Sequence, residues 1–461
     1  MKSSPSQENP LGILPVNQLL ARFAIPSIIA MLVSALYNIV DQFFIGRSVG
    51  MLGNAATNVA FPLTITCTAI SLMCGIGGAA NFNLSLGSGE KEEATRYAGN
   101  AVFMLAAIGV LLCLTVRLFL KPLMIVFGAT PDVLDYSLTY TGITSLGFPF
   151  LILTTGGSNL IRADGSPRFS MMCTLTDAVL NTILDPLFIF GFHMGMAGAA
   201  LATIIGQIIS GIMVIVYLTR FKTVHLSLGS LVPVPSHMKA IAALGMAPFF
   251  NQMAMMVVQI VMNNILRYYG AQSHYGSEIP LACAGIITKV NMIFFSLVIG
   301  LSQGLQPIVS FNYGAKKLDR VSRTFRLLLT SCMTYSTVLW AVAMFAPMVY
   351  IRIFTQDAAL TAFSEWSIRI YMAASLLFGA QLACQQTFIA IGDSKTSLFL
   401  ALLRKVILLI PLIYVLPNLF ENKVFAVFVA EPIADTIAVC TTVTLFLLSF
   451  RKMKRELGAN A

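Results

Sequence analysis

Charged residues are scarce in this chain: Asp, Glu, Lys and Arg make up 10% of its 461 residues, whereas soluble domains carry about 25%. Hydrophobic residues account for 57% and lie in long blocks with few or no charges. A membrane-spanning helix requires about 20 mostly apolar residues, and these blocks are too long and alternate too little for the strands of a membrane barrel. The composition excludes a soluble globular domain and predicts an all-α integral membrane protein.

Several chemical signatures are also missing. The chain has eight cysteines but no C-x-x-C pair, so a disulfide framework or a metal site is not expected. Its four histidines do not cluster, and H-E-x-x-H, G-x-S-x-G and the phosphate-loop spacing are absent. A membrane enzyme or receptor is therefore a second choice, and we expect no cofactor. Without an ATPase motif, any active transport has to draw on an ion gradient.

Twelve segments have the length and hydropathy of spanning helices once tilt and flanking residues are counted. They lie near residues 17–45, 54–86, 94–118, 133–161, 168–191, 196–219, 240–266, 280–312, 324–349, 358–390, 396–418 and 424–450.

The net charge of +10 indicates topology rather than nucleic-acid binding. With the amino terminus in the cytoplasm, 21 of the 29 Lys and Arg residues fall on that side, including Arg404 and Lys405 in an assumed loop, and seven fall on the other. The remaining one, Lys289, lies inside a span. The positive-inside rule then places both termini in the cytoplasm, in a bacterial or archaeal cell membrane. No cleavable signal is evident, so the first span is expected to direct insertion.

The chain repeats itself, which is the most informative feature of its organisation. Gly314 follows Gly87 by 227 positions in matching helix-end motifs, and Pro248 follows Pro26 by 222. Six helices in each half make this a parallel repeat, one of the two common plans of transporters. We therefore expect two lobes and a linker, covering residues 1–220, 237–461 and 221–236.

Three helices of the first half each carry an oxygen-bearing pair spaced by four residues, which places both members on one helix face. The pairs are Tyr37 with Asp41, Asn181 with Asp185, and Thr203 with Gln207. A carboxylate inside a membrane costs at least about 2.5–3.5 kcal/mol, so these acids are candidates for binding H⁺ or Na⁺, which prefers oxygen ligands. The alternative is that each acid only caps or staples helices.

Pro26 lies inside the first predicted helix, fifteen positions before Asp41. Proline removes a backbone hydrogen bond and kinks a helix. The helix could bend when Asp41 changes charge, or the kink could be static.

The second half differs from the first at the acids. Asn263 occupies the repeat position of Asp41, and the spans instead offer Lys289 and Glu431. These two could form an ion pair, or Lys289 could reach water at the membrane surface.

Polarizable methionines flank polar residues in the seventh span. Met253, Met256, Gln259 and Asn263 could line a cavity for flat, apolar and varied molecules, or simply pack against other helices. With Gln207, Lys289 and Glu431 they form the predicted substrate cavity.

Taken in order, the motifs resemble the multidrug and toxic compound extrusion (MATE) family, in particular its prokaryotic DinF-like and MepA-like branches. The matching motifs are Tyr37-Asn-Ile-Val-Asp41 with Phe44-Ile45-Gly46, Asn181-x-x-Leu-Asp185-Pro186, Gly198-Ala-Ala-x-Ala-Thr203-x-x-Gly206-Gln207, Gly304-x-x-Pro307 with Asn312-Tyr-Gly314, and Ala390-x-Gly392. The resemblance covers nearly the whole chain.

This resemblance implies a V-shaped fold of twelve helices and the export of cationic or amphipathic compounds in exchange for H⁺ or Na⁺. It implies a bending role for Pro26 and a cation site in the first lobe, formed by Tyr37, Asp41, Asn181, Asp185 and Thr203. The second lobe departs from the branch that uses carboxylate ligands there, because its candidate positions hold Gln259, Asn263, Gln381, Gln385 and Gln386.

The partners expected from these observations are small amphipathic or cationic substrates and membrane lipid, for a protein acting as a monomer. The rival function within transport is a flippase, or an exporter dedicated to one lipid-linked or metabolite substrate.

Overall fold

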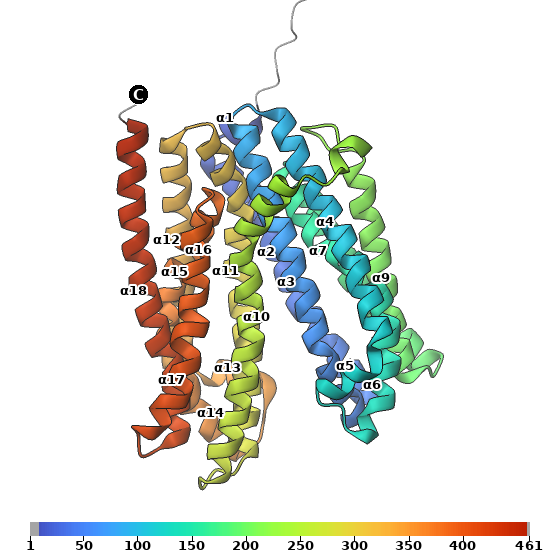
Figure 1. Ribbon diagram of the computed structural model, residues 1–461. Helices are drawn as coiled ribbons and strands as arrows, with labels where there is room; N and C mark the ends of the chain where they lie inside the picture. Colours follow the sequence, from blue (N-terminus) through green and yellow to red (C-terminus); the bar gives the residue numbers. More distant parts are fainter. Residues whose placement is uncertain (1–8, 459–461) are drawn as a thin grey trace, which may run out of the picture.

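The computed structural model describes residues 9–458 as an almost entirely helical molecule (Figure 1). Within this range no residue belongs to a β-strand. Residues 1–8, which the sequence assigns to the amino-terminal lobe, and residues 459–461 lie outside the description.

The first half contains a short helix and six spans. The short helix is α1 (Pro10–Ile13), and the spans are α2 (Val16–Ser48), α3 (Met51–Gly87), α4 (Lys91–Leu118), α6 with α7 (Pro131–Thr144 and Phe148–Ala163), α8 with a π-helical turn (Pro167–Pro186 and Leu187–Gly191) and α9 (Gly195–Leu218). The connection between α4 and α6 forms α5 (Leu120–Val126).

The second half follows the same order. Its spans are α10 (Pro235–Ala271), α11 (Glu278–Gly314), α12 (Leu318–Phe345), α14 with α15 (Ala358–Tyr371 and Ser375–Ala390), α16 with a π-helical turn and α17 (Ser394–Leu402, Leu403–Leu409 and Ile410–Val415) and α18 (Lys423–Gly458). The short α13 (Met348–Phe354) precedes α14. Eleven of the described helices could cross a membrane, or twelve when the bent pair α14–α15 counts as one, in agreement with the prediction.

Two predicted helices are broken rather than continuous. The span predicted over 133–161 is interrupted by a 3₁₀ turn at Ser145–Gly147. The turn ends two residues before Pro149, whose ring cannot continue the hydrogen-bond ladder. The span predicted over 358–390 bends by 46° between α14 and α15. At this bend the indole N–H of Trp340 donates to the Ala373 carbonyl at 2.9 Å.

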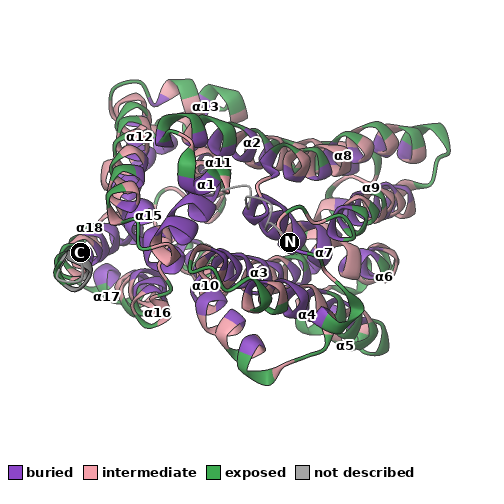
Figure 2. Cartoon of the chain, turned by 90° about the horizontal axis from the view of Figure 1, so that it is seen from above, coloured by how far each residue is buried: buried purple, intermediate pink, exposed green. Residues whose placement is uncertain are grey.

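The helices form two bundles, α2 to α9 and α10 to α18, which lie beside each other when viewed from above (Figure 2). Both α1 and the carboxyl end of α18 lie at the same end of the molecule (Figure 1). We call this end the terminus side and the opposite end the far side. The bundles meet on the terminus side and diverge toward the far side (Figure 1).

Close helix packing joins the lobes on the terminus side. A methyl group on Gly304 of α11 would lie 2.8 Å from the Cα of Ala24 in α2, nearer than real methyl groups approach. Gly77 of α3 lies similarly close to the carbonyl of Ile241 in α10. Glycine permits these contacts because it has no side chain.

The apolar cores follow the same division. One cluster of buried residues combines the first lobe with second-lobe residues of the terminus side, such as Phe82 with Ile308. A second cluster, between Val258 and Ala434, contains only second-lobe residues among those described. The apolar core in the far half of the second lobe is therefore formed within that lobe, without residues of the first lobe.

The segment before the first span is held by the second lobe. Asn312 Nδ2 donates to the Leu11 carbonyl at 2.9 Å, and Lys317 Nζ donates to the Gly12 carbonyl at 3.0 Å. Arg320 donates to the Leu14 carbonyl at 2.6 Å. These bonds close the terminus side across the lobe boundary.

Candidate ion-coupling site in the first lobe

The predicted polar pairs of the first lobe come together where α8 packs between α2 and α9. Tyr37 interacts electrostatically with Asp41 and Asp185. Asn181 donates from Nδ2 to Thr203 Oγ1 at 3.1 Å. All five predicted residues thus belong to one cluster inside the lobe.

The carboxyl groups of Asp41 and Asp185 are direct neighbours. Asp185 is 0% exposed, and neither of its oxygens, nor Oδ1 of Asp41, accepts a hydrogen bond from a residue within 9–458. Two adjacent carboxylates repel each other, and burial without a partner disfavours the charged form. The pair therefore requires a proton or a bound cation.

The Asn181 side chain adds a fourth unpartnered oxygen beside these acids. The Thr203 hydroxyl donates its proton to the Ala199 carbonyl at 3.0 Å, so it can only accept from Asn181, and this fixes the orientation of the amide. The Asn181 Oδ1 is consequently left buried without a partner. Such a set of oxygens suits Na⁺ as well as a proton.

Two further residues lie beside this cluster and were not predicted. Tyr140 of α6 interacts with Asp41, Asp185 and Thr203, and no sequence spacing could have linked it to them. Asp177 of α8 interacts with Tyr37. It precedes Asn181 by four residues, so its helical spacing was a usable signal.

Pro26 is buried in the part of α2 that contacts α11, and α2 is helical on both sides of it. Gly300 of α11 packs against Ile28, and Gly304 packs against Ala24. At 1.5 Å per residue, Asp41 lies about 22 Å further along the same helix. One helix thus connects the lobe interface with the acid cluster.

The predicted cavity residues of the seventh span all lie on α10, but they do not line either of two pockets found among the described residues. Met253, Met256, Gln259 and Asn263 are each half-buried. Gln259 Nε2 lies 3.4 Å from Thr288 Oγ1. Gln207 of α9, in contrast, is buried within the first lobe with its Oε1 unpartnered.

The possible ion pair between Lys289 and Glu431 is not formed. Lys289 is exposed, with its ammonium 5.9 Å from the centre of the Phe354 ring. Glu431 instead accepts from Lys405 Nζ at 3.0 Å and lies 3.5 Å from the Arg404 guanidinium.

Arg404 and Lys405 were assigned to a cytoplasmic loop, and this assignment is wrong. Both are buried in the π-helical turn after α16, inside the eleventh span. Arg404 Nε contacts Asp435 Oδ1 at 2.5 Å. Glu431 and Asp435 are four residues apart on α18, so both face this turn. The two acids compensate the two bases within the lobe.

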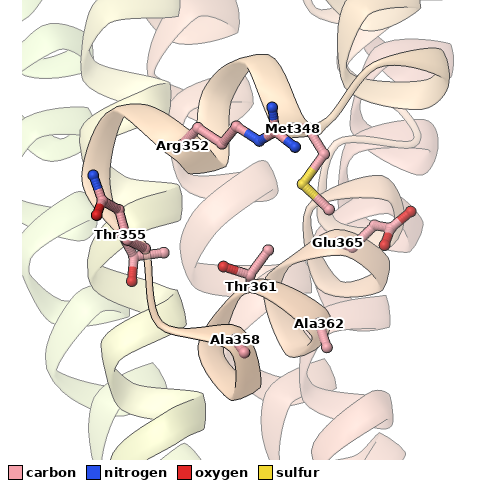
Figure 3. A pocket seen from close by; sticks show the side chains of 8 residues that line it. Met348, Arg352, Thr355, Ala358, Thr361, Ala362 and Glu365 are labelled. Atoms are coloured by element: carbon pink, nitrogen blue, oxygen red, sulfur yellow. The ribbon is translucent and has the colours of Figure 1, made fainter.

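One surface hollow lies away from these residues. It has a volume of about 580 Å³ and is lined from α13 and α14 by residues that include Met348, Arg352, Thr361 and Glu365 (Figure 3). It includes none of the predicted site residues, and we assign it no role in the site.

Two helical lobes with an uncompensated acid pair buried in one of them define a membrane transporter rather than an enzyme. The chain belongs to the MatE family, whose model matches residues 26–187 and 249–415. One match falls in each half of the chain, and members of this family are secondary transporters.

The relatives belong to the MepA-like branch of the family. The chain is 25% identical over 429 residues to the multidrug export protein MepA of Staphylococcus haemolyticus, with 92% of each chain covered. It is 26% identical over 436 residues to MepA of Staphylococcus saprophyticus, with 93% of each covered.

Solved structures share the fold. A crystal structure of MATE in complex with MaL6 has a TM-score of 0.90 at 19% identity, covering 98% of this chain and 100% of that one. The outward-facing conformation of a multidrug resistance MATE family transporter of the MOP superfamily has a TM-score of 0.89 at 19% identity, with the same coverage.

Proposed function

We propose that this chain is an H⁺- or Na⁺-coupled antiporter that exports cationic and amphipathic drugs and other toxic organic compounds by alternating access. The observation that carries the proposal is the adjacent pair Asp41 and Asp185, whose buried oxygens Asp41 Oδ1, Asp185 Oδ1 and Asp185 Oδ2 accept no hydrogen bond within residues 9–458. The multidrug export proteins among the relatives support the class of substrate.

The coupling ion acts at the acid pair. When the far side is open, a proton or Na⁺ enters and neutralises Asp41 and Asp185, with Tyr37, Asn181 and Thr203 supplying further oxygens. A ligand can shift a conformational equilibrium only through different affinities for the two states. The ion binds the state in which these oxygens are assembled, and its loss favours the other state.

The change at the acids reaches the lobe interface through α2. Asp41 and Pro26 lie on this helix, and the residues around Pro26 pack against Gly300 and Gly304 of the second lobe. Bending at Pro26 alters that contact, so ion binding and lobe movement are coupled. The half-buried residues Met253, Met256, Gln259 and Asn263 on α10, with Gln207, Lys289 and Glu431, contribute to the path of the substrate.

The proposal also covers the membrane location, the oligomeric state and the orientation of the protein. The chain acts as a monomer in a bacterial or archaeal cell membrane, in contact with lipid and without nucleic acid. Both termini lie in the cytoplasm, a placement supported by the position of α1 and the end of α18 at one end of the molecule (Figure 1). The lobes comprise residues 1–220 and 237–461, joined by the linker 221–236. Transport uses H⁺ or Na⁺ as the coupling ion and requires no cofactor.

The test is dye transport in proteoliposomes under an imposed proton or sodium gradient, applied one at a time. We expect one gradient to drive export of ethidium, and Asp41→Asn and Asp185→Asn each to abolish it. Asp357→Asn, in the second lobe, is the control, because Asp357 caps α14 at an exposed position. Wild-type transport in both acid variants contradicts the site. Transport of a lipid-linked compound but of no cation would favour the flippase.

A further inference from the structure

A third acid lies on the same face of α8 as the proposed coupling site. Asp177, Asn181 and Asp185 are spaced by four residues, which aligns them along about 12 Å of the helix. Asp177 therefore lies two turns from Asp185, toward the terminus side. Asp177, like Asp41 and Asp185, lies within electrostatic range of the Tyr37 hydroxyl.

Asp177 packs against α9 at a position that only glycine leaves open. A methyl group on Gly206 would lie 2.5 Å from Asp177 Oδ1 and 3.0 Å from its carbonyl oxygen. Methyl groups do not approach oxygen so closely in folded proteins, so any larger residue at position 206 would displace the carboxylate.

The three acids on this side of the lobe, Asp41, Asp177 and Asp185, have no basic partner within residues 9–458, because none of the ion pairs of this range includes them. One proton or cation at the Asp41–Asp185 pair relieves the repulsion between those two groups. It leaves the charge of Asp177, about 12 Å along the helix from Asp185, without a counterion.

The acids also differ in access. Asp185 is 0% exposed, whereas Asp177 is half-buried and so can be reached by an incoming group. An unpartnered oxygen that lies between Asp177 and Asp185 also points to a ligand here. The Asn181 side chain, one turn away and 1% exposed, has a carbonyl oxygen without a partner.

We propose that Asp177 binds the positively charged group of the exported substrate, a quaternary or protonated ammonium, and that Asp41 and Asp185 bind the coupling ion for which the substrate is exchanged. The Tyr37 ring contributes an aromatic surface of the kind that attracts such groups, and Asn181 Oδ1 accepts an N–H of the substrate in the state that has released the coupling ion. This inference rests on the proposed function and assigns to one residue the preference for cations. Neutral amphiphiles do not require Asp177.

The experiment compares a cationic and a neutral dye, ethidium and Nile red, in proteoliposomes containing the full chain. For Asp177→Asn we expect KM for ethidium to rise by about tenfold or more, the size of a lost charge-assisted contact, with KM for Nile red unchanged. Asp185→Asn, which removes a coupling residue, should stop transport of both dyes. Equal KM values for ethidium in wild type and Asp177→Asn overturn the inference, as does an equal loss for both dyes.

A second variant covers the case in which Asp177→Asn does not fold. Gly206→Ala keeps the charge but moves the carboxylate, and it should raise KM for ethidium selectively; an unchanged KM for ethidium contradicts the inference. The proposed function fails separately if the wild-type protein moves neither dye under either gradient. If the wild type exports ethidium and the variants do so equally well, only the role of Asp177 is refuted.

Discussion

The Arg162 guanidinium at the end of α7 donates a hydrogen bond to Gln303 Oε1 of α11, 3.0 Å away in the other lobe. Arg162 is buried and also donates to Asn159 within its own lobe, but no carboxylate within the described residues pairs with it. A buried cation thus depends on a neutral partner across the interface.

Gln303→Ala should weaken this junction. A hydrogen bond to a charged group contributes about 1.5–3 kcal/mol, so amide hydrogen-exchange protection in α11 around position 303 should fall by about ten- to hundredfold. Gln303→Glu should act in the opposite direction by giving Arg162 a counterion. Gln42→Ala, at an exposed position of α2, is the control. Unchanged protection in Gln303→Ala would show that the bond does not hold the lobes.

Gly245→Ala tests the close packing of α10 on α3. A methyl group at this position would collide with the Met73 carbonyl, and main-chain atoms cannot rotate away as a side chain can. We expect the closed terminus side to lose about 1–3 kcal/mol. Spin-label distances between α3 and α10 on that side should lengthen, and dye export should fall.

Gly285→Ala provides a matched control, because this α11 glycine has open space where the methyl group would lie. If both glycine variants show the same distances and export rates, close contact between α3 and α10 is not required for closure.

Arg404→Ala should destabilise the second lobe. It leaves Asp435 buried without its 2.5 Å partner, and removal of one member of a buried ion pair typically costs about 3–5 kcal/mol. Thermal unfolding in detergent should show a clearly lower Tm. Lys289→Ala, at an exposed lysine without an ion pair among the described residues, should change stability by less than about 0.5 kcal/mol.

Replacement of Arg404 and Asp435 together, by Met and Leu, should recover much of the loss because no charge is then left unpaired. A double variant as unstable as Arg404→Ala would indicate that packing of Arg404 on the Phe378 ring, 4.6 Å from its guanidinium, carries the effect.

The fold could be predicted because it depends on regularities along the chain. Apolar blocks gave the spans, and the matched glycines at 87 and 314 gave the two halves. The pairs Tyr37–Asp41 and Asn181–Asp185 could be found because residues four apart on a helix lie next to each other on one face.

The rest depends on contacts between helices. Tyr140 joins the acids from α6, with which it shares no sequence period. The π-helical turn at Leu403–Leu409 turns Arg404 and Lys405 toward α18, and a count of basic residues assigned them instead to a loop. The expected pair of Lys289 with Glu431 does not form because Glu431 pairs with Arg404 and Lys405 of this turn.

The main-chain carbonyls of Leu11, Gly12 and Leu14 accept hydrogen bonds, and all of the donating side chains belong to the second lobe: Asn312, Lys317 and Arg320. The first transmembrane helix is therefore anchored to one lobe at its start and carries the acid of the other lobe near its end. The helix α2 is therefore attached to both lobes. When the lobes separate on the terminus side, either these hydrogen bonds must break or α2 must bend.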